Sequence, residues 1–278
     1  MSTAAGFPEG YEPPKVWAYD DDVKATAGSN DPTAGARKTQ ALPAKGAHAI
    51  QLYSLGTPNG VKVSILLEEL NDLQGVEYDA WKINFGDLDQ FGSGFVEVNP
   101  NSKIPAMLDY DVSPPVRVFE SGSILLYLAE KYGAFLPADV ARRVEAKNWL
   151  FWQVGGGPSM GALGHFKNVA PVKLKYAVDR FALETKRQLS VLEQHLARDD
   201  MTYVAGSEYS IADIAIWPWI RTLLTSYKAG EFLDFAASYP HVQAWYDKIA
   251  DRPAVQRGVR VLGFGENALP ERHSKADF

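Results

Sequence analysis

Residues 50–70 read IQLYSLGTPNGVKVSILLEEL, and this stretch decides the fold. Its first four residues alternate in polarity, as in a short strand. Thr57-Pro58-Asn59-Gly60 then breaks the strand, and residues 61–70 carry apolar side chains at helical spacing. The stretch therefore predicts a strand, a turn and a helix.

Further elements follow along the chain. Residues 76–83, 104–108 and 116–119 are strand candidates, and residues 121–132 predict a helix that ends at Gly133. A β-α-β unit followed by two consecutive strands and a helix packs as a small mixed sheet covered by helices. This order predicts a thioredoxin-like domain with a four-stranded mixed sheet.

The second half of the chain is predicted to be nearly all helical. Residues 139–154, 171–199 and 240–250 are the main candidates. Ser210 and Asp213 fit a capping box, in which the serine oxygen accepts from the Asp213 amide and the aspartate reaches back. We expect Asp213 to hold a buried helix start and to take no part in chemistry.

These patterns predict an α/β domain followed by an all-α domain. The thioredoxin-like domain spans residues 47–134 and the all-helical domain residues 139–257. Residues 1–46, rich in Gly, Pro, Ala and Asp, predict an irregular N-terminal extension, and residues 258–278 an irregular tail.

Composition excludes several classes of protein. With 46% hydrophobic and 22% charged residues the chain is typical of globular proteins. A net charge of −6 gives no attraction for phosphate backbones, so nucleic acid is not an expected partner. Residues 1–10 lack the basic and apolar regions of a signal peptide, and no run approaches the ~18 apolar residues of a membrane span. We therefore expect a cytoplasmic protein with no membrane partner.

The chain contains no cysteine. This excludes disulfides, thiolate metal sites and a cysteine nucleophile, so any sulfur chemistry requires a sulfur-bearing ligand. The five histidines show no metal-ligand spacing, and we expect no metal.

One pattern offers a different class of enzyme. Gly157-Pro158-Ser159-Met160-Gly161 matches the G-x-S-x-G nucleophile elbow of serine hydrolases. An elbow follows a strand, whereas residues 148–154 predict a helix. A helix break over the active-site cleft is the interpretation that we favour.

Three motifs resemble those of cytosolic glutathione transferases: Ser102-Lys103-Ile104-Pro105, Glu120-Ser121-Gly122-Ser123-Ile124-Leu125 and Ser210-Ile211-Ala212-Asp213. Others narrow the resemblance to the Nu class of bacterial disulfide-bond reductases, related to the fungal nitrogen-regulating prion protein: Gln51-Leu52-Tyr53-Ser54, Thr57-Pro58-Asn59-Gly60, Asp89-Gln90-Phe91 and Ile216-Trp217-Pro218-Trp219. The resemblance covers about residues 11–275. It implies a homodimer with glutathione as co-substrate, in one or two molecules per site.

The resemblance also implies how glutathione is held. A cis bond before Pro105 would turn the N–H and C=O of Ile104 toward the cysteinyl part of glutathione; a trans proline starting an edge strand is the alternative. Ser121 would donate to the γ-glutamyl carboxylate and Glu120 would pair with its α-amino group. The alternative is a plain N-cap serine with an acidic first turn.

The resemblance places the sulfur of bound glutathione at the turn before the helix predicted over residues 61–70. By resemblance, the Thr57 hydroxyl, the Asn59 amide and the helix N-terminus would hold the thiol as thiolate. A turn without a ligand is the alternative. Tyr53 is expected in the core of the sheet and not at the sulfur.

Three further binding residues are implied by resemblance. Gln90 would bind the glutathione backbone or carboxylate, Lys103 the glycyl carboxylate, and Arg180 glutathione, including a second molecule. The alternatives are a surface glutamine, a solvated lysine and a pair between Arg180 and Glu184 along one helix.

These assignments predict a glutathione-dependent disulfide-bond oxidoreductase. Bound glutathione thiolate would attack a disulfide, and a second glutathione would resolve the mixed disulfide. Reduction of hydroperoxides and conjugation to electrophiles are expected side activities. The alternative is a non-catalytic glutathione-binding regulatory protein of the same fold.

Overall fold

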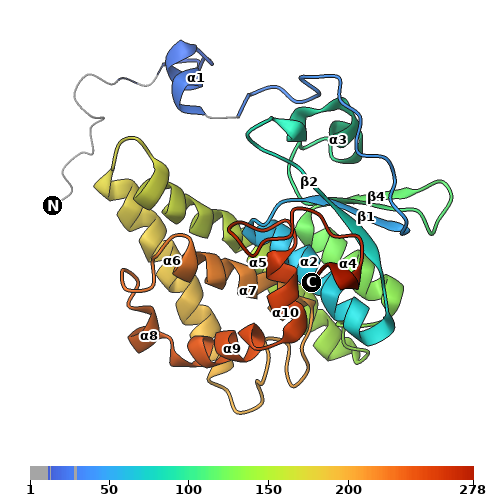
Figure 1. Ribbon diagram of the computed structural model, residues 1–278. Helices are drawn as coiled ribbons and strands as arrows, with labels where there is room; N and C mark the ends of the chain where they lie inside the picture. Colours follow the sequence, from blue (N-terminus) through green and yellow to red (C-terminus); the bar gives the residue numbers. More distant parts are fainter. Residues whose placement is uncertain (1–11, 13, 28–29) are drawn as a thin grey trace. The chain divides into compact units, whose positions relative to one another are not determined.

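The computed structural model describes residues 12, 14–27 and 30–278, which belong to two units, Met1–Ala34 and Gly35–Phe278. The other residues of the predicted extension lie outside the described residues. Within the first unit the extension is not wholly irregular, because it forms helix α1 (Asp21–Ala27), where Asp20 accepts from the Val23 amide at 2.9 Å. All other elements belong to the second unit (Figure 1).

A four-stranded mixed sheet forms the first half of the second unit, as predicted. Its strands are β1 (Ile50–Ser54), β2 (Tyr78–Lys82), β3 (Ala106–Asp109) and β4 (Val116–Phe119), in the order β2-β1-β3-β4. β1 pairs parallel with β2 and antiparallel with β3, and β3 pairs antiparallel with β4. This order brings the carboxyl end of β1 beside the start of β3.

Helices cover both faces of the sheet. On one face Leu52, Met107 and Val118 pack beneath α2 (Pro58–Gln74) and α4 (Ser121–Tyr132). On the other face Tyr53 and Ala106 pack in a smaller cluster with α3 (Ser93–Val98), which follows the short η1 (Asp89–Phe91). Successive residues of a strand point to opposite faces, so Leu52 and Tyr53 belong to different clusters. Tyr53 is buried, as predicted.

The second half of the unit is helical, as predicted (Figure 1). α7 is almost entirely buried and packs against α2, α5 and α9. In the described part of the chain, no helix is both long and apolar enough to span a membrane. The elements are α5 (Val140–Gly164), the π-helical turn η2 (His165–Val169), α6 (Lys175–Leu196), α7 (Ile211–Thr225), α8 (Phe235–Ser238), α9 (Pro240–Ala250), α10 (Pro253–Arg260) and η3 (Lys275–Asp277).

The predicted helix break at Gly157–Gly161 is wrong. α5 runs without interruption through Pro158. Ser159 therefore lies inside a helix, and the residues directly before it are helical. A nucleophile elbow is therefore not formed. Proline removes one helical hydrogen bond, yet α5 continues through it. A Cβ at Gly157 would lie 3.1 Å from the Trp219 ring, so glycine lets α5 approach α7 closely.

The predicted capping box at the start of α7 is confirmed. The Asp213 carboxylate accepts from the Ser210 amide at 3.0 Å, and the Ser210 hydroxyl oxygen accepts from helix amides in return. Asp213 is 0% exposed and also accepts from the Val204 amide and the Trp245 indole N–H, each at 2.9 Å. One carboxylate therefore ties together α7, α9 and the loop before α7.

The C-terminal tail packs into the first half of the unit. Arg272 is 0% exposed; its Nε donates to Glu68 of α2 at 3.1 Å and its Nη1 to the Tyr78 carbonyl at 2.8 Å. The Ala80 amide of β2 donates to the Arg272 carbonyl at 2.7 Å. The tail is therefore fixed along β2 and α2, while the domain boundaries at 46/47, 134/139 and 257/258 stay predictions.

Candidate functional site

The start of α2 presents hydrogen-bond donors. Thr57 is the N-cap residue, and its Oγ1 accepts from the Gly60 amide at 3.3 Å. A hydroxyl that accepts in this way still has its own hydrogen to donate. A Cβ at Gly60 would lie 1.9 Å from the Leu55 carbonyl oxygen, so glycine is required for the tight entry from β1 into α2.

Asn59 is held in one orientation by the helical half. Its Oδ1 accepts from the Trp219 indole N–H of α7 at 3.1 Å. Indole nitrogen only donates, so the amide NH2 of Asn59 must face away from Trp219. Thr57 and Asn59 thus offer two donors at a helix N-terminus, where the dipole also favours negative charge.

A second helix start lies at Glu120 and Ser121. Glu120 is exposed, has a φ of 69°, and precedes α4 without a side-chain cap. Ser121 is the first residue of α4 and is buried. The alternative of Ser121 as an N-cap serine is wrong, because Glu120 occupies the cap position and the Ser121 hydroxyl accepts from Lys62 at 3.2 Å instead.

Lys62 is a functional candidate that the sequence interpretation missed. It is 1% exposed on α2, and its Nζ donates to Ser121 and to Gln153 of α5. Burial lowers the pKa of Lys62 to about 7, and the Glu120 carboxylate opposes this shift. A lysine within the apolar run of residues 61–67 is the signal that could have identified it.

The Ile104–Pro105 bond is cis, as predicted, and Ile104 is buried. Gln90 lies in η1 and is 4% exposed, so the alternative of a surface glutamine is wrong. Its Oε1 has no hydrogen-bond partner among the described residues. A buried amide oxygen without a donor is costly, which favours a ligand-contacting role for Gln90.

Lys103 and Arg180 are exposed. The Lys103 carbonyl oxygen accepts from the Asn99 side chain at 2.5 Å. The alternative ion pair between Arg180 and Glu184 is not observed: Glu184 pairs with Arg187 at 2.7 Å, and Arg180 acts on Glu184 only through its charge. Within the described chain Arg180 has no ion pair and no hydrogen bond to the other candidate residues.

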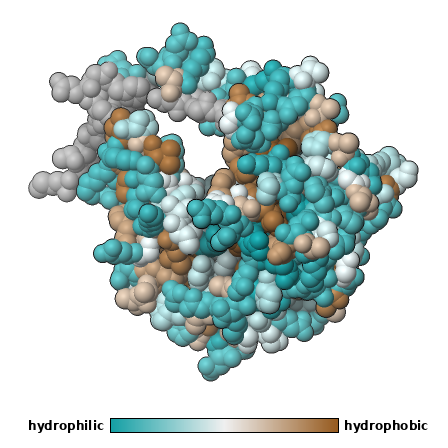
Figure 2. Space-filling view, viewed as in Figure 1, coloured by the Kyte–Doolittle hydropathy of each residue, from teal (hydrophilic) through white to brown (hydrophobic). Residues whose placement is uncertain are grey.

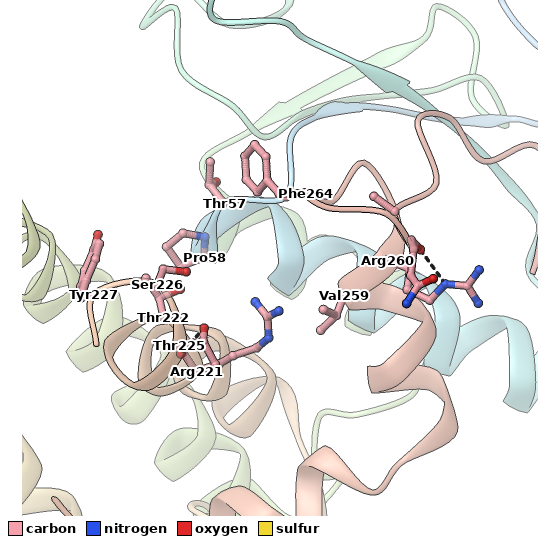
Figure 3. Close-up of a pocket in the computed structure, with 13 residues that line it drawn as sticks. Thr57, Pro58, Arg221, Thr222, Thr225, Ser226, Tyr227, Val259, Arg260 and Phe264 are labelled. Carbon is pink, nitrogen blue, oxygen red and sulfur yellow. Dashed lines mark hydrogen bonds between the residues drawn. The ribbon is translucent and has the colours of Figure 1, made fainter. Parts of the chain in front are cut away.

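A pocket of about 590 Å³ adjoins Thr57 (Figure 3). Its walls are the start of α2, the end of α7 and the tail, where Phe264 lies beside Thr57 and the Arg221 side chain extends between α7 and Val259. The Gly56 amide donates to the Leu262 carbonyl at 2.7 Å, which fixes the tail against the turn before α2. The site can therefore hold a ligand sulfur at Thr57 and a second molecule next to it.

The two halves of this unit match two family models, described as "Glutathione S-transferase, N-terminal domain" over residues 48–130 and "Glutathione S-transferase, C-terminal domain" over residues 175–248. The chain belongs to the glutathione S-transferase family, which confirms the predicted family and fold.

Individual relatives narrow the position of the chain within this family. The chain is 55% identical to the disulfide-bond oxidoreductase YghU of Escherichia coli (strain K12), over 96% of this chain and 95% of that protein. It also resembles the glutathione transferase YghU from Streptococcus pneumoniae, solved in complex with glutathione, with a TM-score of 0.85 at 53% identity over 91% of this chain and 98% of that one. A glutathione transferase from Pseudomonas putida with one glutathione disulfide bound per subunit has a TM-score of 0.74 at 43% identity, over 80% and 95% of the two chains.

Proposed function

We propose that this protein is a glutathione-dependent disulfide-bond oxidoreductase that uses bound glutathione as its only thiol. The observation that carries the proposal is the start of α2, where Thr57 and Asn59 present two oriented donors in a chain without cysteine. The relatives support it, because one is named a disulfide-bond oxidoreductase and others bind glutathione or glutathione disulfide.

Glutathione would extend from α2 to α4 along the first half of the unit. Its thiolate would accept from Thr57 and Asn59, and its cysteinyl backbone would pair with Ile104. Its γ-glutamyl end would contact Glu120 and Ser121 at the second helix start, where α4 favours an anion. Gln90 and Lys103 would bind the rest of the tripeptide, and Arg180 a second glutathione.

Thiol–disulfide exchange then proceeds in two balanced steps. The bound thiolate attacks one sulfur of a substrate disulfide, a new S–S bond forms, and the other sulfur leaves as a thiolate that takes up a proton. A second glutathione thiolate attacks the glutathione sulfur of this mixed disulfide and releases the second substrate thiol. Two glutathiones become one glutathione disulfide, and the substrate gains two electrons.

The pocket beside Thr57 is the proposed place of the substrate disulfide. Its volume of about 590 Å³ falls in the range of small-molecule sites, roughly 300–1,000 Å³. Phe264 and Tyr227 give it apolar walls, and Arg221 a positive charge. The same thiolate would also reduce organic hydroperoxides and conjugate electrophiles.

We also propose a cytoplasmic homodimer of the Nu class. Large apolar side chains are exposed on α5 and α6, among them Val144, Phe151 and Leu183. Figure 2 shows hydrophobic residues at the surface in this region, between hydrophilic ones. Exposed apolar patches of this kind are typical of interfaces. Analytical ultracentrifugation tests the dimer, and a monomer at micromolar concentration would contradict it.

Turnover of a model disulfide tests the function. Hydroxyethyl disulfide is supplied with glutathione, and formation of glutathione disulfide is followed through glutathione reductase and NADPH. We expect turnover that depends on this protein and is lost in Thr57→Val/Asn59→Leu. Binding of glutathione without turnover would refute the enzyme and leave the non-catalytic regulatory protein.

A further inference from the structure

Lys62 is a buried amine that the proposed reaction does not use. Its Nζ lies 3.2 Å from the Ser121 hydroxyl oxygen at the start of α4, and it also donates to the Gln153 side-chain oxygen. The side chain is 1% exposed, so water does not compete for these contacts. Three helices, α2, α4 and α5, therefore meet at one amine. This amine contacts Ser121 at the start of α4, which is assigned to the γ-glutamyl carboxylate.

The charge of Lys62 determines where the Ser121 hydroxyl can point. An ammonium has three donors and no acceptor, so Ser121 must accept from it, and the hydroxyl hydrogen is left to donate elsewhere. A neutral amine has a lone pair and can accept that hydrogen. The protonated lysine therefore directs the Ser121 O–H outward, toward a ligand, and the neutral lysine can turn it inward.

The charges around Lys62 are few. In the described chain, Glu120 before α4 is the charged group that acts on it, and the groups that contact it from α4 and α5, Ser121 and Gln153, are uncharged. Burial lowers the pKa of Lys62 to about 7 against the effect of Glu120. An anion bound at Ser121 would add a second negative charge and favour the protonated form.

We propose that Lys62 is the positioning residue of the carboxylate subsite: its ammonium aims the Ser121 hydroxyl at the bound carboxylate, and the amine takes up a proton as that carboxylate binds. This inference rests on the proposed function, since it concerns the same glutathione site. Protonation of Lys62 would make the affinity for glutathione depend on pH even if the protonation state of the thiol did not change. Above pH 7 the free protein must first be protonated at Lys62, so affinity falls as pH rises.

The test measures proton uptake on binding. S-methylglutathione is the probe, because its sulfur carries no proton. Isothermal titration calorimetry in two buffers of different ionisation enthalpy gives the number of protons taken up, on either side of the pKa of about 7. Above this pH, wild type should take up a fraction of a proton when S-methylglutathione binds. Lys62→Met should lack this proton uptake. At acidic pH, Lys62→Met should bind roughly ten- to a hundred-fold more weakly, the range for a lost hydrogen bond to a charged group.

Matched variants separate positioning from other effects. Lys147→Met removes an equally charged side chain from α5, where it pairs with Glu130, and should bind and take up protons as wild type does. Combining Lys62→Met with Ser121→Ala should lower affinity by less than the product of the two single losses, because Lys62 acts through Ser121. If Lys62→Met does not fold, Lys62→Gln replaces it in the same comparison.

The outcomes distinguish the two proposals. If wild type does not bind S-methylglutathione, the proposed glutathione site is wrong. If wild type binds it, and the Lys62 variant that folds shows the same affinity and the same proton uptake, the role of Lys62 is refuted while the proposed function stands.

Discussion

Removing the two donors at the start of α2 should raise the pKa of the bound glutathione thiol. The perturbation is Thr57→Val together with Asn59→Leu, which keeps the approximate shape of both side chains and deletes their hydrogen-bonding groups. Each donor is oriented by a contact that does not involve the ligand: the Gly60 amide for Thr57 and the Trp219 indole for Asn59. Both are therefore in place before the thiolate forms.

The magnitude follows from these two hydrogen bonds. A hydrogen bond to a charged group contributes about 1.5–3 kcal/mol, and one pKa unit corresponds to about 1.36 kcal/mol. Each donor can thus lower the thiol pKa by about one to two units from a free value of about 8.5. The N-terminus of α2 stays in the double variant and contributes about 0.3–1 kcal/mol. Because the variant removes both donors, we expect a shift of at least about two units, toward but not fully to the free value.

The ultraviolet absorbance of the thiolate measures this pKa directly. Because the chain contains no cysteine, the thiolate signal arises from glutathione alone. The same titration with S-methylglutathione corrects for the tyrosines. Tyr53→Phe is the matched control: burial raises the pKa of Tyr53 to about 12, so it stays protonated over the titration and its loss should change nothing.

Two results would refute this reasoning. An unchanged thiol pKa in the double variant would show that Thr57 and Asn59 do not contact the sulfur. A shift in Tyr53→Phe alone would move the role to the tyrosine. Trp219→Phe offers an intermediate case: it frees the Asn59 amide to rotate and leaves Thr57 in place, so it should give a smaller shift than the double variant.

Four other substitutions separate binding from folding. Ser121→Ala and Glu120→Gln should each weaken glutathione binding in calorimetry by about tenfold or more. Glu120→Gln should leave the melting temperature nearly unchanged, whereas Ser121→Ala removes one acceptor of the buried Lys62 and should also cost about 1–3 kcal/mol of stability; unchanged affinity in both would mean that the site lies elsewhere. Asp213→Ala leaves several buried donors without a partner, at about 1–3 kcal/mol each, so urea unfolding should show a large loss of stability while the folded fraction keeps its glutathione affinity. Arg272→Met leaves the buried Glu68 with the Arg257 guanidinium and the Tyr78 hydroxyl as its remaining donors and should lower the free energy of unfolding by about 3–5 kcal/mol; a loss below 1 kcal/mol would contradict the buried ion pair.

Local sequence patterns were sufficient where the structure depends on neighbouring residues. The alternation of residues 50–53 predicted β1, and the capping box at Ser210 predicted the start of α7. The short α3 (Ser93–Val98) carries too few turns for a helical period and was missed. The uninterrupted α5 was missed as well: Pro158 favours a break locally, whereas the close approach of α5 to Trp219 at Gly157 joins two segments that are distant in sequence.

For the site, residue types could be predicted but burial and pairing could not. A motif can place Gln90 near a ligand, yet its burial depends on how η1 packs beside α3. The Glu184 carboxylate has basic residues both three and four positions away on α6, and sequence spacing does not decide between Arg187 and Arg180. The apolar run around Lys62 could have predicted its burial, but its contacts with Ser121 and Gln153 depend on how α4 and α5 pack against α2 and could not be predicted from sequence.

The C-terminal tail shows most clearly why composition alone was insufficient. Residues 258–278 carry no sustained periodicity and predicted only an irregular tail, which leaves open what the tail contacts; a charged side chain can be buried there when it is paired. Arg272 is buried against Glu68 and lies over the Tyr78 ring at 3.9 Å, which fixes the tail to α2 and β2. The same tail places Phe264 beside Thr57. One wall of the proposed substrate pocket therefore depends on this ion pair, so Arg272→Met should weaken binding of the disulfide substrate more than binding of glutathione.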